Sequence, residues 1–159
     1  MTAGNSLQPA TKLCTSGERP MSHIFFYGLF MNASLLRERG LHPRVVGPAE
    51  LPMYRIRIGS RATLVPDPQS ISYGMLIELS DAEATTLYST PDVSDYRPDN
   101  VNTILLSDRS ICPSLCYNLP ATKLGATRNI EYAEQLSTLV LQLGFPPGYA
   151  SAITRYDNE

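Results

Sequence analysis

Residues 23–31, HIFFYGLFM, decide the fold that the rest of the chain completes. Four apolar residues, 24–27, run into Gly28, and further apolar residues lead to Asn32, a favourable helix start. The pattern predicts a buried strand that passes through a tight glycine turn into a helix. Glycine tolerates positive φ and lets a ligand approach the main chain, and the N-terminus of a helix favours an anion. The turn is therefore either a binding site for a group such as a carboxylate or a plain corner between strand and helix.

Downstream of this turn, short strand patterns alternate with a few helical ones. Ser80 and Glu83 have the spacing of a capping box, which predicts the start of a helix at residue 81. The order of elements predicts an α+β fold in which an antiparallel or mixed sheet curls around a core with helices against it. The expected strands are 23–27, 44–47, 54–58, 61–68, 72–79, 101–106 and 111–119, and the expected helices are 33–39, 81–88, 129–143 and a short one after residue 147.

Length and composition indicate one globular domain. The chain has 159 residues, of which 43% are hydrophobic and 18% charged, and its net charge is −2. No basic field exists to attract nucleic acid or an anionic membrane surface, so we expect neither as a partner. We expect residues 1–20 to be a disordered extension, 21–156 to be the domain and 157–159 to be a tail.

Cysteine and histidine give no sign of a metal site. Cys14, Cys112 and Cys116 have no second Cys or His pair at ligand spacing, and His23 and His42 lack an obvious partner. Free thiols in a reducing cytosol fit best, and the expected location is cytoplasmic. A disulfide between Cys112 and Cys116 stays open, although two such residues on one face of a strand lie too far apart to bridge. Both histidines are expected at the surface, and no cofactor is expected because no dinucleotide or phosphate fingerprint is present.

Five segments resemble, in order, those of the γ-glutamylcyclotransferase-like family, which includes the plant AIG2-like proteins. The resemblance covers residues 24–153 and implies a small barrel-like sheet with a few flanking helices. The segments are FFYGLFM (25–31), SRATLVP (60–66), YGMLIELSDAEATTLYSTPDVSDYRPDNV (73–101), LCYNL (115–119) and NIEYAEQLSTLVLQLGFPPGYASAI (129–153).

The resemblance also implies a reaction. Enzymes of this family cyclise a γ-glutamyl group, whose own α-amine attacks the γ-carbonyl to give 5-oxoproline and release the attached amine. Backbone N–H groups of the glycine turn hold the glutamyl part, and a loop glutamate serves as general acid and base. A carboxylate is needed because the α-ammonium must lose a proton before attack and the leaving amine must gain one.

The chain departs from the family pattern at that glutamate. Pro91 stands at the position of the catalytic residue, and a proline side chain cannot exchange a proton. Leu29 and Phe30 replace the small hydroxyl residue of the turn and its neighbour, which predicts a more apolar pocket. Two carboxylates of the same loop, Asp92 and Asp95, are the candidates for taking over proton transfer. The alternative is that both are solvated turn residues.

Arginine and tyrosine side chains complete the candidate site. Arg61 heads a strand where its guanidinium can grip a substrate carboxylate, whereas Arg97 is more simply explained by a surface ion pair. Tyr27, Tyr96 and Tyr117 match tyrosines of the family segments and can bring hydroxyls to a pocket. The predicted substrate-binding residues are Tyr27, Gly28, Leu29, Phe30, Arg61, Tyr96 and Tyr117.

These observations predict an enzyme of the γ-glutamylcyclotransferase-like fold that acts on a small metabolite carrying an amine and a carboxylate. It would need no metal or cofactor, and Asp92 or Asp95 would transfer the proton. The alternative is a catalytically inactive member that binds a metabolite or a protein in the same pocket. A third hypothesis is a different proton-transfer reaction on a less polar substrate admitted by Leu29 and Phe30.

Overall fold

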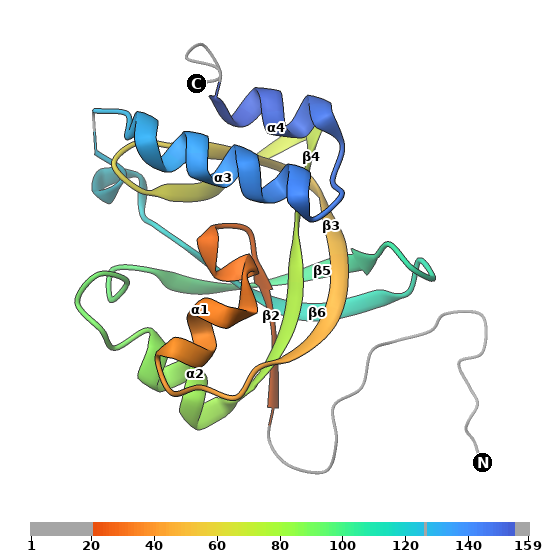
Figure 1. The fold of residues 1–159 in the computed structure, drawn as a ribbon, viewed down its shortest axis with the longest axis vertical. Helices are drawn as coiled ribbons and strands as arrows, with labels where there is room; N and C mark the ends of the chain where they lie inside the picture. Colours follow the sequence, from red (N-terminus) through yellow and green to blue (C-terminus); the bar gives the residue numbers. More distant parts are fainter. Residues whose placement is uncertain (1–20, 126, 155–159) are drawn as a thin grey trace.

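The computed structural model describes residues 21–125 and 127–154, and these form a closed five-stranded barrel with flanking helices (Figure 1). The barrel order is β2-β4-β3-β5-β6, and every pairing is antiparallel except the parallel contact of β2 with β6. The predicted curled, mixed, barrel-like sheet is confirmed. The predictions for residues 1–20 and 157–159 lie outside the described residues. The strands are β2 (Met21–Phe26), β3 (Arg44–Ile58), β4 (Ala62–Ser80), β5 (Arg97–Leu105) and β6 (Ile111–Asn118).

Helices close the barrel on one side and at one end. In Figure 1, α1 and α2 lie low on the face turned to the viewer, whereas α3 and α4 cross the upper end. The predicted capping box is present, because Ser80 accepts from the Glu83 N–H and the Glu83 carboxylate accepts from the Ser80 N–H. The helical segments are η1 (Leu29–Met31), α1 (Ala33–Glu38), α2 (Asp81–Leu87), η2 (Ala121–Lys123), α3 (Ile130–Gln142) and α4 (Pro147–Thr154).

The core fills the barrel and continues under α3 and α4. Strand β2 is buried through its second half, as the apolar run predicts, and its Ile24 and Phe25 are almost fully excluded from solvent. From α3, Ala133, Leu136 and Val140 are buried at the helical spacing that the sequence shows. Burial of each large side chain of this kind contributes about 1.5–3 kcal/mol.

Two pairs of predicted short strands are continuous, and the predicted breaks are wrong. Strand β3 runs through Pro48 and Pro52, and β4 runs through Pro66 and Pro68. The register shifts after Pro52, where Tyr54 faces Pro66 and residues 67–70 bulge out of the ladder. A bulge accommodates residues that cannot donate to a ladder, so the chain keeps its direction through these prolines.

The prediction that His23 lies at the surface is wrong. Its side chain is 9% exposed, and Nε2 lies 3.3 Å from Oε2 of the buried Glu78 on the neighbouring strand. Arg44, on the other side of Glu78, donates to Oε1 at 2.7 Å. His42 has a largely exposed side chain, as expected.

The cysteine prediction is confirmed only in part. Cys116 is a buried free thiol, which rules out a disulfide with Cys112. Cys112 is disulfide-bonded, so the expectation of free thiols is wrong at that residue. The cysteines therefore no longer argue for a reducing compartment.

Candidate functional site

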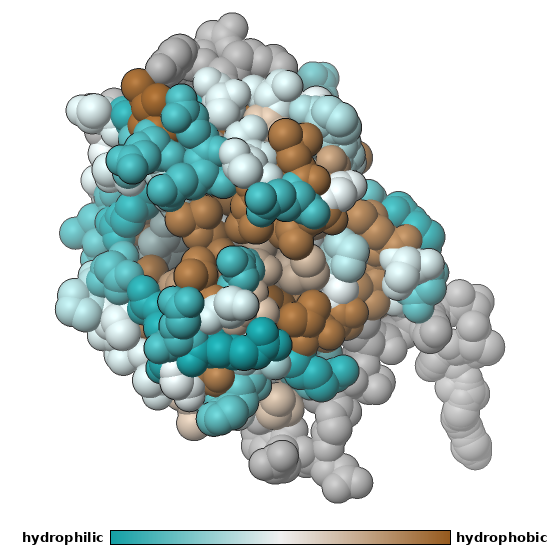
Figure 2. Space-filling model, in the orientation of Figure 1, coloured by the Kyte–Doolittle hydropathy of each residue, from teal (hydrophilic) through white to brown (hydrophobic). Residues whose placement is uncertain are grey.

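A cavity of about 360 Å³ opens at the glycine turn, between α1, α3 and the loop that follows α2. Hydrophobic residues gather on the face between α3 and α1, with hydrophilic residues around them (Figure 2). Eight of the nine predicted site residues line this cavity, and Asp95 is the exception. The lining residues are Phe25, Phe26, Tyr27, Gly28, Leu29, Phe30, Leu35, Arg39, Arg61, Ala62, Tyr88, Asp92, Val93, Tyr96, Tyr117 and Tyr132.

Close approach, and not positive φ, explains the glycine of the turn. Gly28 has φ −103° and ψ −155°, an extended conformation that other residues also adopt. A Cβ atom at this position would lie 2.7 Å from the hydroxyl of Tyr132. The Tyr132 hydroxyl also bonds the backbone of Leu29, so a phenol sits where the sequence predicts exposed N–H groups. Burial raises the pKa of Tyr132 to about 12, although this hydrogen bond lowers it.

Tyr132, in the first turn of α3, was not among the residues that the sequence analysis singled out. The side chain of Asn129 caps this helix by accepting from the Tyr132 N–H at 3.0 Å. The Asn129 N–H in turn donates to the carbonyl of Gly59 at 2.7 Å, which ties α3 to the turn between β3 and β4. Tyr132 lies four residues before the buried Leu136 and packs against the core, so its position in α3 did not distinguish it from a core residue.

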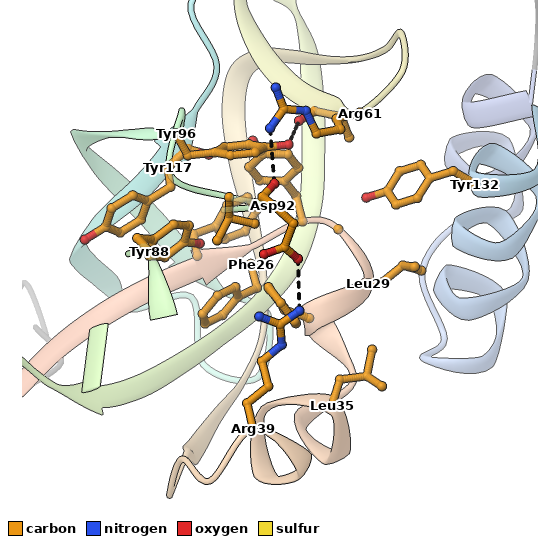
Figure 3. A pocket seen from close by; sticks show the side chains of 16 residues that line it. Phe26, Leu29, Leu35, Arg39, Arg61, Tyr88, Asp92, Tyr96, Tyr117 and Tyr132 are labelled. Atoms are coloured by element: carbon orange, nitrogen blue, oxygen red, sulfur yellow. Dashed lines mark hydrogen bonds and ion pairs between the residues drawn. The ribbon is translucent and has the colours of Figure 1, made fainter. Parts of the chain in front are cut away.

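The carboxylate of Asp92 faces the cavity but is held by an arginine. Its Oδ2 accepts from Nη2 of Arg39 at 3.0 Å (Figure 3), and its Oδ1 accepts from the Thr90 hydroxyl at 2.9 Å. Partial burial raises the pKa of Asp92, but the hydrogen bonds from Arg39 and Thr90 and the charge of Arg39 outweigh it and lower the pKa. In this conformation Asp92 is therefore a weak proton acceptor.

A second ion pair holds the same loop to the barrel. Arg61 donates from Nη2 to Asp95 at 3.1 Å and from Nη1 to the carbonyl of Asp92 at 3.1 Å. Its guanidinium carbon also lies 5.6 Å from the centre of the Tyr96 ring. Arg97 is exposed and donates to the carbonyls of Ser94 and Tyr96, outside the cavity lining.

Most tyrosine hydroxyls of the site are committed to the protein. The Tyr27 hydroxyl lies 2.6 Å from the Tyr117 carbonyl and 2.9 Å from Oδ1 of Asn118. The Tyr96 hydroxyl donates to the Ala62 carbonyl at 2.6 Å. Burial raises the pKa of Tyr27 and of Tyr96, so both phenols stay protonated at neutral pH. These two residues offer rings, and not free hydroxyls, to a ligand.

Besides Tyr132, the sequence analysis missed seven lining residues, and Arg39 and Tyr88 are among them. Arg39 follows α1, and its guanidinium carbon lies 4.9 Å from the centre of the Phe30 ring. The ring of Tyr88 stacks on that of Tyr117, with centres 3.7 Å apart and planes 7° from parallel. Arg39 and Asp92 are 53 positions apart in the chain, so no local pattern connects them.

Solved structures share this fold. An uncharacterized protein from Homo sapiens matches with a TM-score of 0.73 and 14% identity over 89% of this chain and 90% of that chain. A γ-glutamyl cyclotransferase matches with a TM-score of 0.69 and 13% identity over 87% and 89%. A yeast γ-glutamyl cyclotransferase specific to glutathione matches with a TM-score of 0.61 and 12% identity over 86% and 95%. No protein-family model and no curated protein sequence matches the chain. The resemblance in fold is confirmed.

Among residues 21–125 and 127–154, no three His, Cys, Asp or Glu side chains are grouped so that they could hold a metal ion. In the same part of the chain no helix has the length and apolar character needed to cross a membrane.

The candidate site consists of an aromatic cavity, a glycine turn and two arginine–aspartate pairs.

Proposed function

We propose that the chain is a γ-glutamylcyclotransferase-like enzyme that cyclises a γ-glutamyl amide to 5-oxoproline in this cavity. One observation carries the proposal: the carboxylate of Asp92 lies on the cavity wall that faces the glycine turn, one residue after Pro91. The structural neighbours that are named as γ-glutamyl cyclotransferases support it through the shared fold.

The ion pair of Asp92 with Arg39 suggests how a substrate would activate the site. A substrate α-carboxylate that binds Arg39 takes the place of Asp92, whose pKa then rises because its charged partner is occupied. Asp92 accepts a proton from the α-ammonium, and the amine nitrogen attacks the γ-carbonyl carbon. The ring C–N bond forms, and Asp92 returns the proton to the leaving amine as the amide C–N bond breaks. Asp92 then takes the second proton from the ring nitrogen, which leaves 5-oxoproline with a neutral lactam, and passes it to the released amine.

The test is release of 5-oxoproline from γ-glutamyl dipeptides, γ-glutamyl amines, γ-glutamyl-ε-lysine and glutathione. We expect Asp92→Asn to lower kcat about 100-fold or more, since general acid–base catalysis contributes about 10²–10⁴-fold. Asp67→Asn is the matched control, because Asp67 is also paired with an arginine, Arg55, but lies outside the cavity lining.

The Asp95→Asn variant tests which of the two loop carboxylates transfers the proton, because the sequence analysis left the choice between Asp92 and Asp95 open. Asp95 holds Arg61 and does not line the cavity, so we expect its loss to change KM more than kcat. Turnover abolished by Asp95→Asn and retained by Asp92→Asn would show that the proton acceptor is assigned to the wrong residue.

The second candidate is a protein that binds a metabolite without turnover. Pro91 at the position of the family glutamate and the pairing of Asp92 and Asp95 with arginines both favour it. Saturable thermal stabilisation by a γ-glutamyl compound, with no 5-oxoproline released from any of them, would establish this function instead.

A further inference from the structure

Flat aromatic surface forms one side of the cavity. Figure 3 shows Phe26, Tyr88 and Tyr117 gathered on one side, with Leu29 and Tyr132 opposite them. The near-parallel stack of Tyr88 on Tyr117 fixes two ring planes together, which makes this wall rigid. A rigid, flat, apolar wall favours a planar apolar group of a ligand over a flexible polar chain.

The end of the cavity near α1 combines apolar side chains with the guanidinium of Arg39, which lies over the Phe30 ring. Phe30 packs edge-on against Phe26 with centres 6.1 Å apart, and Leu35 and Val93 complete the lining beside them. Aromatic rings prefer edge-to-face or offset contacts at centre distances of about 4.5–7 Å. The aromatic ring of a ligand can therefore make a further edge-to-face or offset contact with these side chains.

Charge at the cavity is balanced within the protein. Arg39 is paired with Asp92 and Arg61 with Asp95, so the four side chains sum to no net charge. One substrate carboxylate is accommodated when it replaces Asp92 as the partner of Arg39. A second carboxylate would meet Arg61 while that side chain is bonded to Asp95 and to the Asp92 carbonyl. Among the described residues, the lining holds no third cation, so a second carboxylate is disfavoured while Arg61 keeps these two bonds.

We propose that the cavity takes γ-glutamyl amides of arylalkylamines that carry no further charged group, with the ring against Phe26 and Tyr88 and the glutamyl carboxylate at Arg39. This inference rests on the proposed function for the γ-glutamyl part, whereas the ring selectivity rests on the aromatic lining alone. The leaving product is then an arylalkylamine, in contrast to the amino acid that a γ-glutamyl dipeptide releases.

Three probes separate the effect of the ring on affinity from the effect of an added charge. They are γ-glutamyl phenethylamide, γ-glutamyl ethylamide, which lacks the ring, and γ-glutamylphenylalanine, which adds a carboxylate to the phenethylamide. Affinity is measured by calorimetry where no turnover occurs, and kcat/KM for 5-oxoproline release where it does. We expect the phenethylamide to exceed the ethylamide by at least about tenfold, because burial of a ring of this size changes affinity by that factor or more. We expect it to exceed γ-glutamylphenylalanine by about tenfold.

Leu35→Ser tests the apolar part of the lining, and Leu141→Ser is its matched control on the exposed surface of α3. Leu35→Ser should reduce the preference for phenethylamide over ethylamide at least threefold, while Leu141→Ser leaves it unchanged. Equal affinity or turnover of phenethylamide and ethylamide, or no binding of any probe, overturns the inference. Tight binding of phenethylamide without 5-oxoproline release supports the inference and removes the proposed reaction.

Discussion

The contact between Gly28 and Tyr132 gives a quantitative test of the site geometry. An alanine Cβ at position 28 would lie 2.7 Å from the Tyr132 hydroxyl, which is buried and bonded to the backbone of Leu29. The backbone at Gly28 is extended, so strain in φ does not contribute. Overpacking of this kind costs about 1–3 kcal/mol. We expect Gly28→Ala to lower the free energy of unfolding by about 2 kcal/mol, which corresponds to a decrease in Tm of about 4–8 °C.

A double-mutant cycle then identifies the atom responsible. Tyr132→Phe removes the hydroxyl and its bond to Leu29, at a cost of about 1 kcal/mol. In the Gly28→Ala/Tyr132→Phe protein the added methyl group meets no oxygen, so the two effects should fall short of their sum by about 1.5 kcal/mol. Urea unfolding followed by circular dichroism measures all four proteins. Effects that add to within about 0.5 kcal/mol would refute the placement of the Tyr132 hydroxyl against Gly28.

Two further predictions concern buried polar groups of the barrel. Asn118→Leu should lower the free energy of unfolding by about 2–4 kcal/mol. The reason is that Oδ1 of Asn118 accepts from the Leu64 N–H at 3.1 Å and from the Tyr27 hydroxyl at 2.9 Å. A loss of less than about 1 kcal/mol, measured by urea unfolding, would contradict this prediction. Burial lowers the pKa of His23 against the opposing effect of Glu78, so the unfolded chain binds the proton more tightly and stability should fall as the pH drops below about 6.5. His23→Gln should remove this part of the pH dependence, and a profile unchanged between pH 5 and 7 would show that His23 does not cause it.

The sequence patterns correctly predicted those elements that depend on interactions between residues close together in the chain. The strand, glycine turn and helix start at residues 24–32, the capping box at Ser80 and the apolar face of α3 all follow from side chains within a few positions of one another. The prolines of β3 and β4 misled the prediction because a bulge between two paired strands is a property of the pair. A single strand pattern cannot show it.

Contacts across long separations account for what the sequence could not predict at the site. The resemblance predicted that the glycine turn and the loop after α2 share a site, but it did not single out Arg39, at the end of α1, or Tyr132, in α3. The sequence correctly singled out Gly28, yet the reason is the approach of Tyr132 and not a left-handed backbone. Asp92 and Asp95 lie three positions apart in the same loop, and only the fold shows that Asp92 lines the cavity and Asp95 does not.

The strength of the Arg39–Asp92 pair decides whether a substrate can use this site. The Asp92 side chain is 59% exposed, and ion pairs in such positions contribute at most about 1 kcal/mol because solvent screens them. A ligand carboxylate that displaces Asp92 therefore loses no more than about fivefold in affinity. It gains a guanidinium that the Phe30 ring already orients. Displacement is thus inexpensive, and the pair that makes Asp92 a weak base in the free protein does not prevent it from accepting a proton once a substrate is bound.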